Sequence, residues 1–167
     1  MHELQIGDIA PNFSAPNCDG IEISLNDFLG KTILLYFYPK DNTPGCTIQA
    51  KDFSLLKEDF EALGCVILGI SPDTPKSHKS FICKQDLSIT LLSDPDKKIA
   101  TSYGAYGKKL LYGKEVMGIK RSSFLIDANA KIAKTYYNVK AKDHAQKVLQ
   151  DLRAKTSQAQ AQAKSKV

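Results

Sequence analysis

The 167-residue sequence has no hydrophobic run long enough to cross a membrane, no tryptophan and only four cysteines. Its longest apolar runs, at 33–38 and 66–70, are far shorter than the roughly 20 residues that a transmembrane helix needs. The first residues contain neither a basic segment nor an apolar one, so they do not resemble a secretory signal. We therefore expect a cytoplasmic protein with no membrane partner.

Acidic residues are absent after Asp151, whereas four basic ones follow it: Arg153, Lys155, Lys164 and Lys166. Most of the net charge of +5 therefore belongs to the C-terminal tail. The rest of the chain is nearly neutral, which argues against a nucleic-acid partner. We expect residues 1–154 to form one domain, and the Gln/Ala-rich tail at 155–167 to be a frayed helical extension or disordered.

The cysteines Cys18, Cys46, Cys65 and Cys83 include no Cys-x-x-Cys pair, and no histidine lies at zinc-site spacing. We expect no metal and no cofactor. In a reducing compartment the cysteines should be free thiols, so any cysteine with a function should act through the reactivity of its thiol. The three histidines show no triad spacing either and are expected at the surface rather than as catalytic bases. They are His2, His78 and His144.

Hydrophobic periodicity predicts strands at 33–38, 66–70, 123–126 and 132–137, preceded by a hairpin of 12–15 and 21–25. Helices are expected at 47–63, from 73–75 to about 86, from 94–96 to 103 and at 142–153. The stretch 103–118, with four glycines and three lysines, predicts a long turn-rich connection with solvated lysines. This order is typical of the α/β thioredoxin-like fold, a central mixed sheet flanked by helices, here with an N-terminal β-hairpin extension.

Cys46 lies where a predicted core strand turns into a predicted helix. The unpaired N–H groups and the positive dipole end of a helix start favour an anion, and so a thiolate. Thr43 can donate its hydroxyl to a bound oxygen, Gly45 lets the backbone come close, and Pro39 and Pro44 fix the approach. The segment thus predicts a nucleophilic cysteine suited to an oxyanion or a peroxide.

The pattern Pro39-x-x-x-Thr43-x-x-Cys46 is similar to the active-site pattern of peroxiredoxins, and residues 36–47 closely resemble the Q-type, or bacterioferritin comigratory, subfamily. Matching segments at 7–13, 68–73, 91–94 and 112–127 extend the resemblance over about residues 4–152. It implies a thiol peroxidase of antioxidant defence that reduces hydrogen peroxide and organic hydroperoxides without metal, haem or flavin. It also implies thioredoxin or another thiol as the reductant, and a monomer.

The same resemblance assigns roles to individual residues. Cys46 would be the peroxidatic cysteine, which becomes a sulfenic acid. Pro39 would shield it from solvent, and Thr43 would orient the peroxide. Arg121 would stabilise the thiolate and the charge on the leaving oxygen. Gln49, one turn into the helix, could hydrogen-bond to that arginine.

The resolving cysteine departs from the subfamily pattern. Many members place it five residues after the peroxidatic one, where this chain has Lys51. Other members place it on the helix after Asp73. In this chain Cys83 lies on that helix, but one residue away from the matching position, which turns it about 100° around the helix. The resemblance leaves two main routes open: resolution by Cys83, after local fraying of both helices, or direct attack by an external thiol. Cys65 and Cys18 are weaker candidates.

Other classes of function compete with the peroxidase. A thiol:disulfide oxidoreductase on the same fold is disfavoured because Gln49 stands where its second cysteine would be. A non-enzymatic thioredoxin-fold binding module leaves the combination of Pro39, Thr43, Cys46 and Arg121 unexplained. A glutathione-peroxidase-like enzyme is disfavoured too, because the active site of that family uses a tryptophan and this chain has none.

Overall fold

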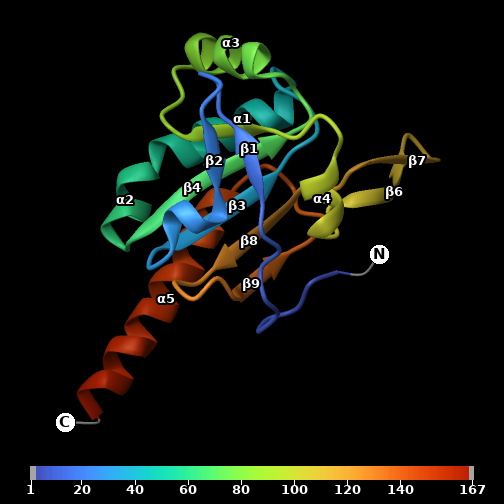
Figure 1. Cartoon of the computed structure of the whole chain (residues 1–167). Coiled ribbons are helices and arrows are strands. Elements are labelled where there is room, and N and C mark those ends of the chain that lie inside the picture. Colours follow the sequence, from blue (N-terminus) through green and yellow to red (C-terminus); the bar gives the residue numbers. More distant parts are fainter. Residues whose placement is uncertain (1–2, 166–167) are drawn as a thin grey trace.

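The computed structural model describes residues 3–165 and is built on a five-stranded sheet in the order β5-β4-β3-β8-β9 (Figure 1). Strands β3, β4 and β5 run parallel, whereas β8 and β9 are antiparallel to their neighbours. The strands span β3 Thr32–Phe37, β4 Cys65–Ser71, β5 Thr90–Ser93, β8 Ser122–Ile126 and β9 Ile132–Tyr136. The four strands predicted for the core are confirmed, and β5 is an addition to them.

The two faces of the sheet carry separate apolar clusters, because side chains alternate along each strand. On β3, Leu34 and Tyr36 point into one cluster, while Ile33, Leu35 and Phe37 point into the other. The first cluster is covered by α1 (Pro44–Leu55), α2 (Lys57–Ala62), α3 (Pro75–Gln85) and α5 (His144–Ser165). The second is covered by α4 (Lys98–Ser102) and by the N-terminal segment. The layers agree with the predicted α/β fold.

The predicted N-terminal hairpin is present as β1 (Ser14–Pro16) and β2 (Glu22–Ser24), followed by the short helix η1 (Leu25–Phe28). Its turn is closed by a backbone hydrogen bond from Gly20 to Asn17. Gly20 has φ of +77°, a left-handed conformation that glycine adopts without steric cost. Asp127 likewise closes the predicted turn between β8 and β9, because its side chain accepts from the amides of Asn129 and Lys131.

The helix predicted at 47–63 is wrong in one respect: it is two helices, α1 and α2, separated at Leu56. Leu56 has φ of −97° and ψ of 3°, so the helical path bends there while its apolar residues still reach the sheet. The predicted stop at Gly64 is confirmed, with φ of +72°. Thr74 begins α3 as predicted, and its hydroxyl accepts from the Ser77 amide.

The turn-rich connection predicted at 103–118 is wrong, because the segment is a β-hairpin that extends from the body (Figure 1). It consists of β6 (Tyr106–Leu111) and β7 (Lys114–Ile119), joined by the tight turn at Tyr112 and Gly113. Its glycines concealed the pairing, since Gly107 and Gly118 face each other across the two strands. Lys109 is not simply solvated either, because its ammonium group donates to the Ile119 carbonyl.

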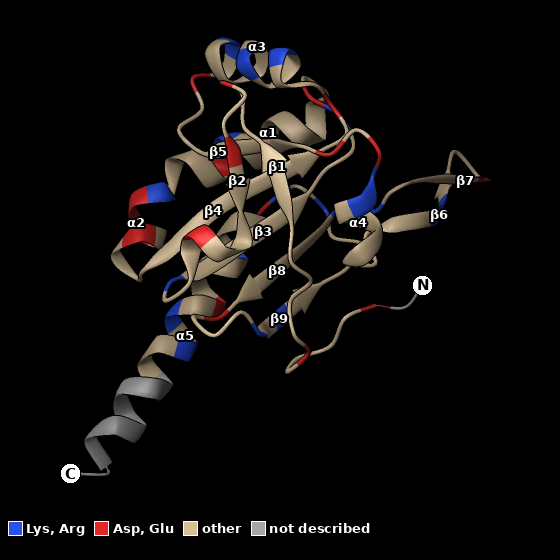
Figure 2. Ribbon diagram, in the orientation of Figure 1, with Lys and Arg blue, Asp and Glu red and all other residues tan. Residues whose placement is uncertain are grey.

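Helix α5 continues to Ser165, past the core-covering helix predicted at 142–153, so the tail through Ser165 takes the helical of the two alternatives. Its apolar stripe covers the sheet through Leu152. Figure 2 shows basic residues where the helix leaves the sheet, in keeping with the excess charge of the tail. Within residues 3–165, no helix is both long enough and apolar enough to cross a membrane.

Candidate active site

Cys46 is the third residue of α1, in the first turn as predicted, and its side chain is buried. Thr43 is the N-cap residue with extended backbone, and Pro44 takes the first helical position, where a missing N–H costs nothing. The Thr43 hydroxyl donates to the Lys40 carbonyl at 2.8 Å instead of capping the helix. The Thr43 side chain therefore leaves the first-turn N–H groups of α1, where Cys46 stands, uncapped.

Arg121 connects Cys46 to Gln49. Its Nη2 lies 3.3 Å from Cys46 Sγ, and its Nη1 donates to Gln49 Oε1 at 2.5 Å. Gln49 is fully buried, so its carbonyl oxygen fixes the guanidinium from inside the protein. A positive charge at this distance in a buried site can stabilise negative charge that develops at the sulfur or beside it.

Gly45 makes room for this arginine. A Cβ atom at this position would lie 3.2 Å from Arg121 Nη2, closer than most Cβ contacts in proteins. A larger residue would therefore crowd the guanidinium that contacts the sulfur. From the sequence, Gly45 was expected to let the backbone come close to a bound peroxide. In the structure it also makes room for the side chain of Arg121.

The antiparallel pairing of β8 with β3 explains why a residue 75 positions from Cys46 reaches it. Ser122 pairs with Phe37, so Arg121 stands immediately beside the loop that leaves β3. The backbone carbonyl of Arg121 accepts from the Val139 amide at 2.9 Å, which holds the start of β8 in place. Sheet register therefore delivers the arginine to the start of α1.

Pro39 and Arg121 line a surface hollow of about 390 Å³. The hairpin contributes Lys109, Leu110 and Ile119 to the walls, so the segment that the sequence presents as a loop borders the same hollow as Pro39 and Arg121. Burial and the neighbouring Arg121 lower the pKa of Lys109 below its usual value. The hollow thus combines apolar side chains with the basic residues Lys109, Lys120 and Arg121.

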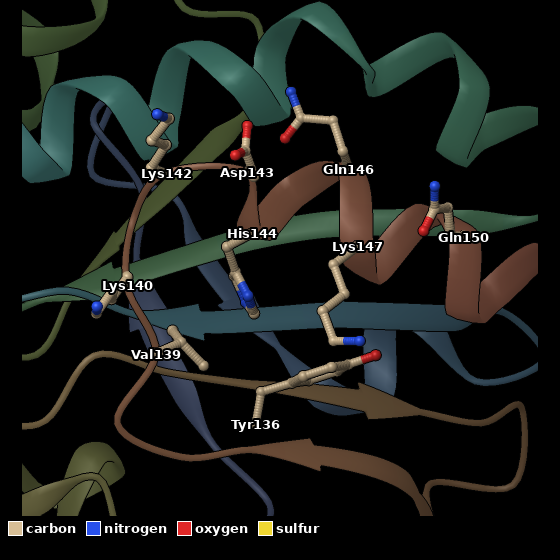
Figure 3. Close-up of a pocket in the computed structure, with 9 residues that line it drawn as sticks. All are labelled: Tyr136, Val139, Lys140, Lys142, Asp143, His144, Gln146, Lys147 and Gln150. Carbon is tan, nitrogen blue, oxygen red and sulfur yellow. The ribbon is translucent and has the colours of Figure 1, made fainter.

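A larger hollow, of about 540 Å³, lies between the end of β9 and α5 (Figure 3). Three lysines, Lys140, Lys142 and Lys147, stand around it, and His144 lies on its wall (Figure 3). None of the site residues predicted from the sequence lines it. A choice between the two hollows by volume alone would therefore miss the place where Cys46, Arg121 and Gln49 meet.

The surface position predicted for His144 is wrong, because the side chain is 5% exposed. Its Nε2 lies 2.8 Å from the Ser123 hydroxyl, and its ring meets Phe53 and Tyr136 edge to face. Burial, together with the positive charge of Arg121, lowers the pKa of His144 to about 4. The ring is therefore neutral at physiological pH, and it leaves Arg121 as the positive charge beside the sulfur.

Acid should destabilise the protein through His144. Its pKa is lower in the folded chain than in the unfolded chain, so the unfolded state binds more protons as pH falls below about 6.5. Between pH 7.5 and pH 5 we expect a loss of about 2 kcal/mol from this group. Urea unfolding of the wild type and of His144→Gln at pH 7.5 and pH 5 measures this loss of stability. The variant should lose about 2 kcal/mol less than the wild type. Equal losses in the two proteins would contradict the role of His144.

The other cysteines differ sharply from Cys46, and all four are free thiols. Cys65 begins β4 and is buried, which raises its pKa to about 12 and makes it inert, as expected. Cys18 is partly exposed in the hairpin turn. Cys83 is exposed on α3 and has no disulfide partner in this state. The structure therefore does not join Cys46 to Cys83.

His78 is also buried rather than on the surface, which is a second error of the sequence analysis. Within residues 3–165, Asp41, Asp73 and His78 have three potential metal-ligand atoms within 4.8 Å of one another. Those atoms already take part in hydrogen bonds among themselves and with Ser71 and Ser77. The group is thus a closed polar network next to the Cys46 loop. Sequence spacing contained no sign of it, because Asp41 and His78 are 37 positions apart.

The sequence matches known proteins over most of its length. Residues 6–135 match the AhpC/TSA family. The chain is 55% identical to "Putative peroxiredoxin bcp" of Helicobacter pylori, over 91% of this chain and all of the relative. It is 44% identical to "Peroxiredoxin Bcp" of Escherichia coli, over 89% of this chain and 96% of that one.

Solved structures agree on the fold. A cysteine-to-serine mutant of Xylella fastidiosa PrxQ superposes with a TM-score of 0.87 at 35% identity, covering 93% of this chain and 99% of that one. Xanthomonas campestris bacterioferritin comigratory protein, described by its alkyl peroxide reduction activity, gives a TM-score of 0.80 at 37% identity, covering 85% and 90%. The predicted thioredoxin-like fold is confirmed.

Proposed function

Because this chain belongs to the AhpC/TSA family and is a peroxiredoxin, a thiol peroxidase, we propose that Cys46 is the sulfur that attacks the peroxide. The observation that carries the proposal is the 3.3 Å contact between Cys46 Sγ and Arg121 Nη2 at the start of α1. Cys18, Cys65 and Cys83 have no such contact among the side-chain hydrogen bonds of the described residues.

The proposed reaction moves two electrons from sulfur to the peroxide. The Cys46 thiolate attacks one peroxide oxygen, the O–O bond breaks, and the sulfur becomes a sulfenic acid. The second oxygen leaves as an alkoxide or hydroxide and takes a proton to give alcohol or water. Arg121 stabilises the negative charge as it passes from the sulfur to the leaving oxygen. Gln49 holds Arg121 in place, and this hydrogen bond supports its role as a positioning residue.

Thr43 and Pro39 would shape the peroxide site. The hydroxyl of Thr43 points back to the loop at Lys40 in this state, and it can turn to a bound peroxide oxygen from the same N-cap position. Pro39 would limit the access of water, a role supported by its place in the wall of the 390 Å³ hollow. Because Leu110 and Ile119 are also in that wall, we propose that organic hydroperoxides are substrates as well as hydrogen peroxide.

Regeneration needs a dithiol that supplies two electrons. We propose thioredoxin as this reductant, with glutaredoxin or another thiol as the alternative. In the first of two routes, the Cys83 thiolate attacks the sulfur of the Cys46 sulfenic acid, the S–O bond breaks, and hydroxide leaves and takes a proton from solvent to give water. The resulting disulfide is then reduced by thioredoxin. In the second, the external thiol attacks the sulfenic acid directly. The exposure of Cys83 on α3 supports the first route, although its helix must unwind locally to bring the two Cα atoms within about 7 Å.

Mass spectrometry distinguishes the nucleophile and the route in one experiment. We expect one equivalent of hydrogen peroxide to remove two hydrogens from the intact mass, and non-reducing peptide mapping to find a Cys46–Cys83 peptide. The Cys83→Ser variant should instead hold one added oxygen on Cys46, which dimedone traps. Oxidation at another cysteine first would refute the proposed nucleophile. A wild type that gains only one oxygen would refute Cys83 as the resolving residue.

The thiol:disulfide oxidoreductase alternative has less support. Such an enzyme needs a second thiol one turn after the first, and here Gln49 is fully buried in that position and bonded to Arg121. Its activity would be detected as reduction of insulin disulfides, and we expect none above background.

A further inference from the structure

A buried polar network joins the loop before Cys46 to helix α3. Asp41 lies in the loop between β3 and α1, and His78 lies near the start of α3. The first is 5% exposed and the second fully buried. Figure 1 shows α3 at the end of the sheet where β3 stops and α1 begins. Two groups that usually stay in water have thus been buried beside the site.

Three donors converge on the Asp41 carboxylate. Tyr38 donates its hydroxyl at 2.6 Å, Ser77 donates at 2.8 Å, and His78 Nδ1 lies at 2.7 Å. The backbone amide of Asp41 donates to Asp73 at 2.8 Å. A buried carboxylate is stable only when such partners compensate its lost hydration. Because two of the donors belong to α3, the loop and the helix hold each other.

His78 extends the network to the sheet. Its Nε2 lies 3.0 Å from the carbonyl oxygen of Leu92 in β5, an atom that can only accept. Both ring nitrogens therefore lie within hydrogen-bond distance of an oxygen. His78 thereby ties three elements together: the loop, α3 and β5.

The loop needs this anchoring. Asn42, between Asp41 and Thr43, has φ of +62°, a left-handed conformation that asparagine tolerates better than most residues. The loop therefore turns sharply at Asn42, and the bonds of Asp41 hold the residue next to it. Thr43 follows as the N-cap of α1, so a displaced loop would move the hydroxyl and the helix start that face the sulfur.

The same bonds oppose the release of α3. Cys83 lies five residues after His78 on this helix and is exposed, whereas Cys46 is buried, so the two thiols are not joined in this state. A contact that holds the start of α3 against the loop therefore favours the first chemical step and slows the second. Loss of this contact should slow the attack on peroxide and speed the formation of the disulfide, so an experiment can separate the two effects.

We propose that His78 is a positioning residue for the peroxidase reaction and acts through Asp41. It holds the 39–43 loop in the geometry for attack by Cys46 and keeps α3 closed until Cys83 resolves the sulfenic acid. The effect on α3 rests on the proposed role of Cys83, whereas the effect on the 39–43 loop does not.

Two substitutions separate the two bonds of the ring. In His78→Asn the amide nitrogen falls near the position of Nδ1, so the donor to Asp41 is kept. In His78→Gln it falls near Nε2, so the donor to Leu92 is kept and that to Asp41 is lost. In a Cys83→Ser background, which isolates the first step, we expect the Asn variant to react with peroxide within about threefold of its parent. The Gln variant should be about tenfold slower, as for the loss of a hydrogen bond to a charged group.

The second step supplies a readout that simple destabilisation would not produce. With Cys83 present, His78→Gln should form the Cys46–Cys83 disulfide severalfold faster than wild type once the sulfenic acid exists, and should accumulate less sulfinic acid in excess peroxide. Rapid-quench mass spectrometry measures both. Val148→Ala, a buried change on α5 away from the network, is the control for a general loss of stability and should not accelerate disulfide formation.

Equal first-step rates for the Asn and Gln variants would overturn the proposal, as would slowing of both steps in His78→Gln. If wild type forms no Cys46–Cys83 disulfide, the role of Cys83 fails. The first-step comparison of the two variants, made without Cys83, still decides whether His78 acts through Asp41.

Discussion

Replacement of Cys46 by serine should abolish peroxide consumption, with a loss of at least about a thousandfold. The change replaces sulfur by oxygen in a side chain of the same shape, so α1 and its packing should persist. A serine hydroxyl beside Arg121 is not ionised at neutral pH, and its oxygen is a poor nucleophile toward the O–O bond. Oxidation of NADPH by thioredoxin reductase, thioredoxin and hydrogen peroxide measures the turnover.

Cys18→Ser is the matched control, because Cys18 is partly exposed in the hairpin turn and has no role in the proposed reaction. It should keep wild-type turnover. Circular dichroism of both variants checks that the fold is retained. Turnover by Cys46→Ser at the wild-type rate would refute the central assignment.

Replacement of Arg121 by methionine should slow the first step by about a hundredfold to a thousandfold, as does the removal of one donor that stabilises a developing negative charge. Methionine fills much of the same space but cannot stabilise the thiolate or the leaving oxygen. Lysine keeps the charge yet lacks the planar fork that bridges Cys46 and Gln49, so Arg121→Lys should fall between the two. Single-turnover reaction with hydrogen peroxide, monitored by rapid-quench mass spectrometry, gives the second-order rate constant.

Arg153 is the only other arginine in the sequence and serves as the control. It lies on α5, where it forms an exposed ion pair with Asp59, so Arg153→Met should leave the rate constant unchanged. A loss of less than about threefold in Arg121→Met would show that the guanidinium adds little to the transition state.

Local features of the sequence were sufficient for part of the site. The run from 36 to 47 contains the end of a strand, two prolines, a glycine and the start of a helix, so the place of Cys46 could be predicted from neighbours alone. The core strands were equally clear, since their apolar runs are bounded by turn residues. The contact between Arg121 and Gln49 was anticipated through family resemblance, not from local pattern.

Features that depend on distant pairing could not be predicted. His78 lies in a polar stretch of α3, and only the folded chain brings Asp41 to it and buries both. The β6–β7 hairpin was missed because glycines and lysines lack the apolar alternation of a buried strand. Strand β5 has only four residues, too few for a periodic signal.

The antiparallel pairing of β8 with β3 ties catalysis to the last stages of folding. A slip of one residue in this pairing would shift Arg121 by about 3.4 Å along the strand and turn side chains to the opposite face. Secondary structure would survive such a slip, but the arginine would no longer reach the sulfur. The pairing also joins segments about ninety residues apart, and such distant contacts close slowly. A newly made chain would thus gain its thiol chemistry only when this register is complete, and until then its cysteine would lack the cation that activates it.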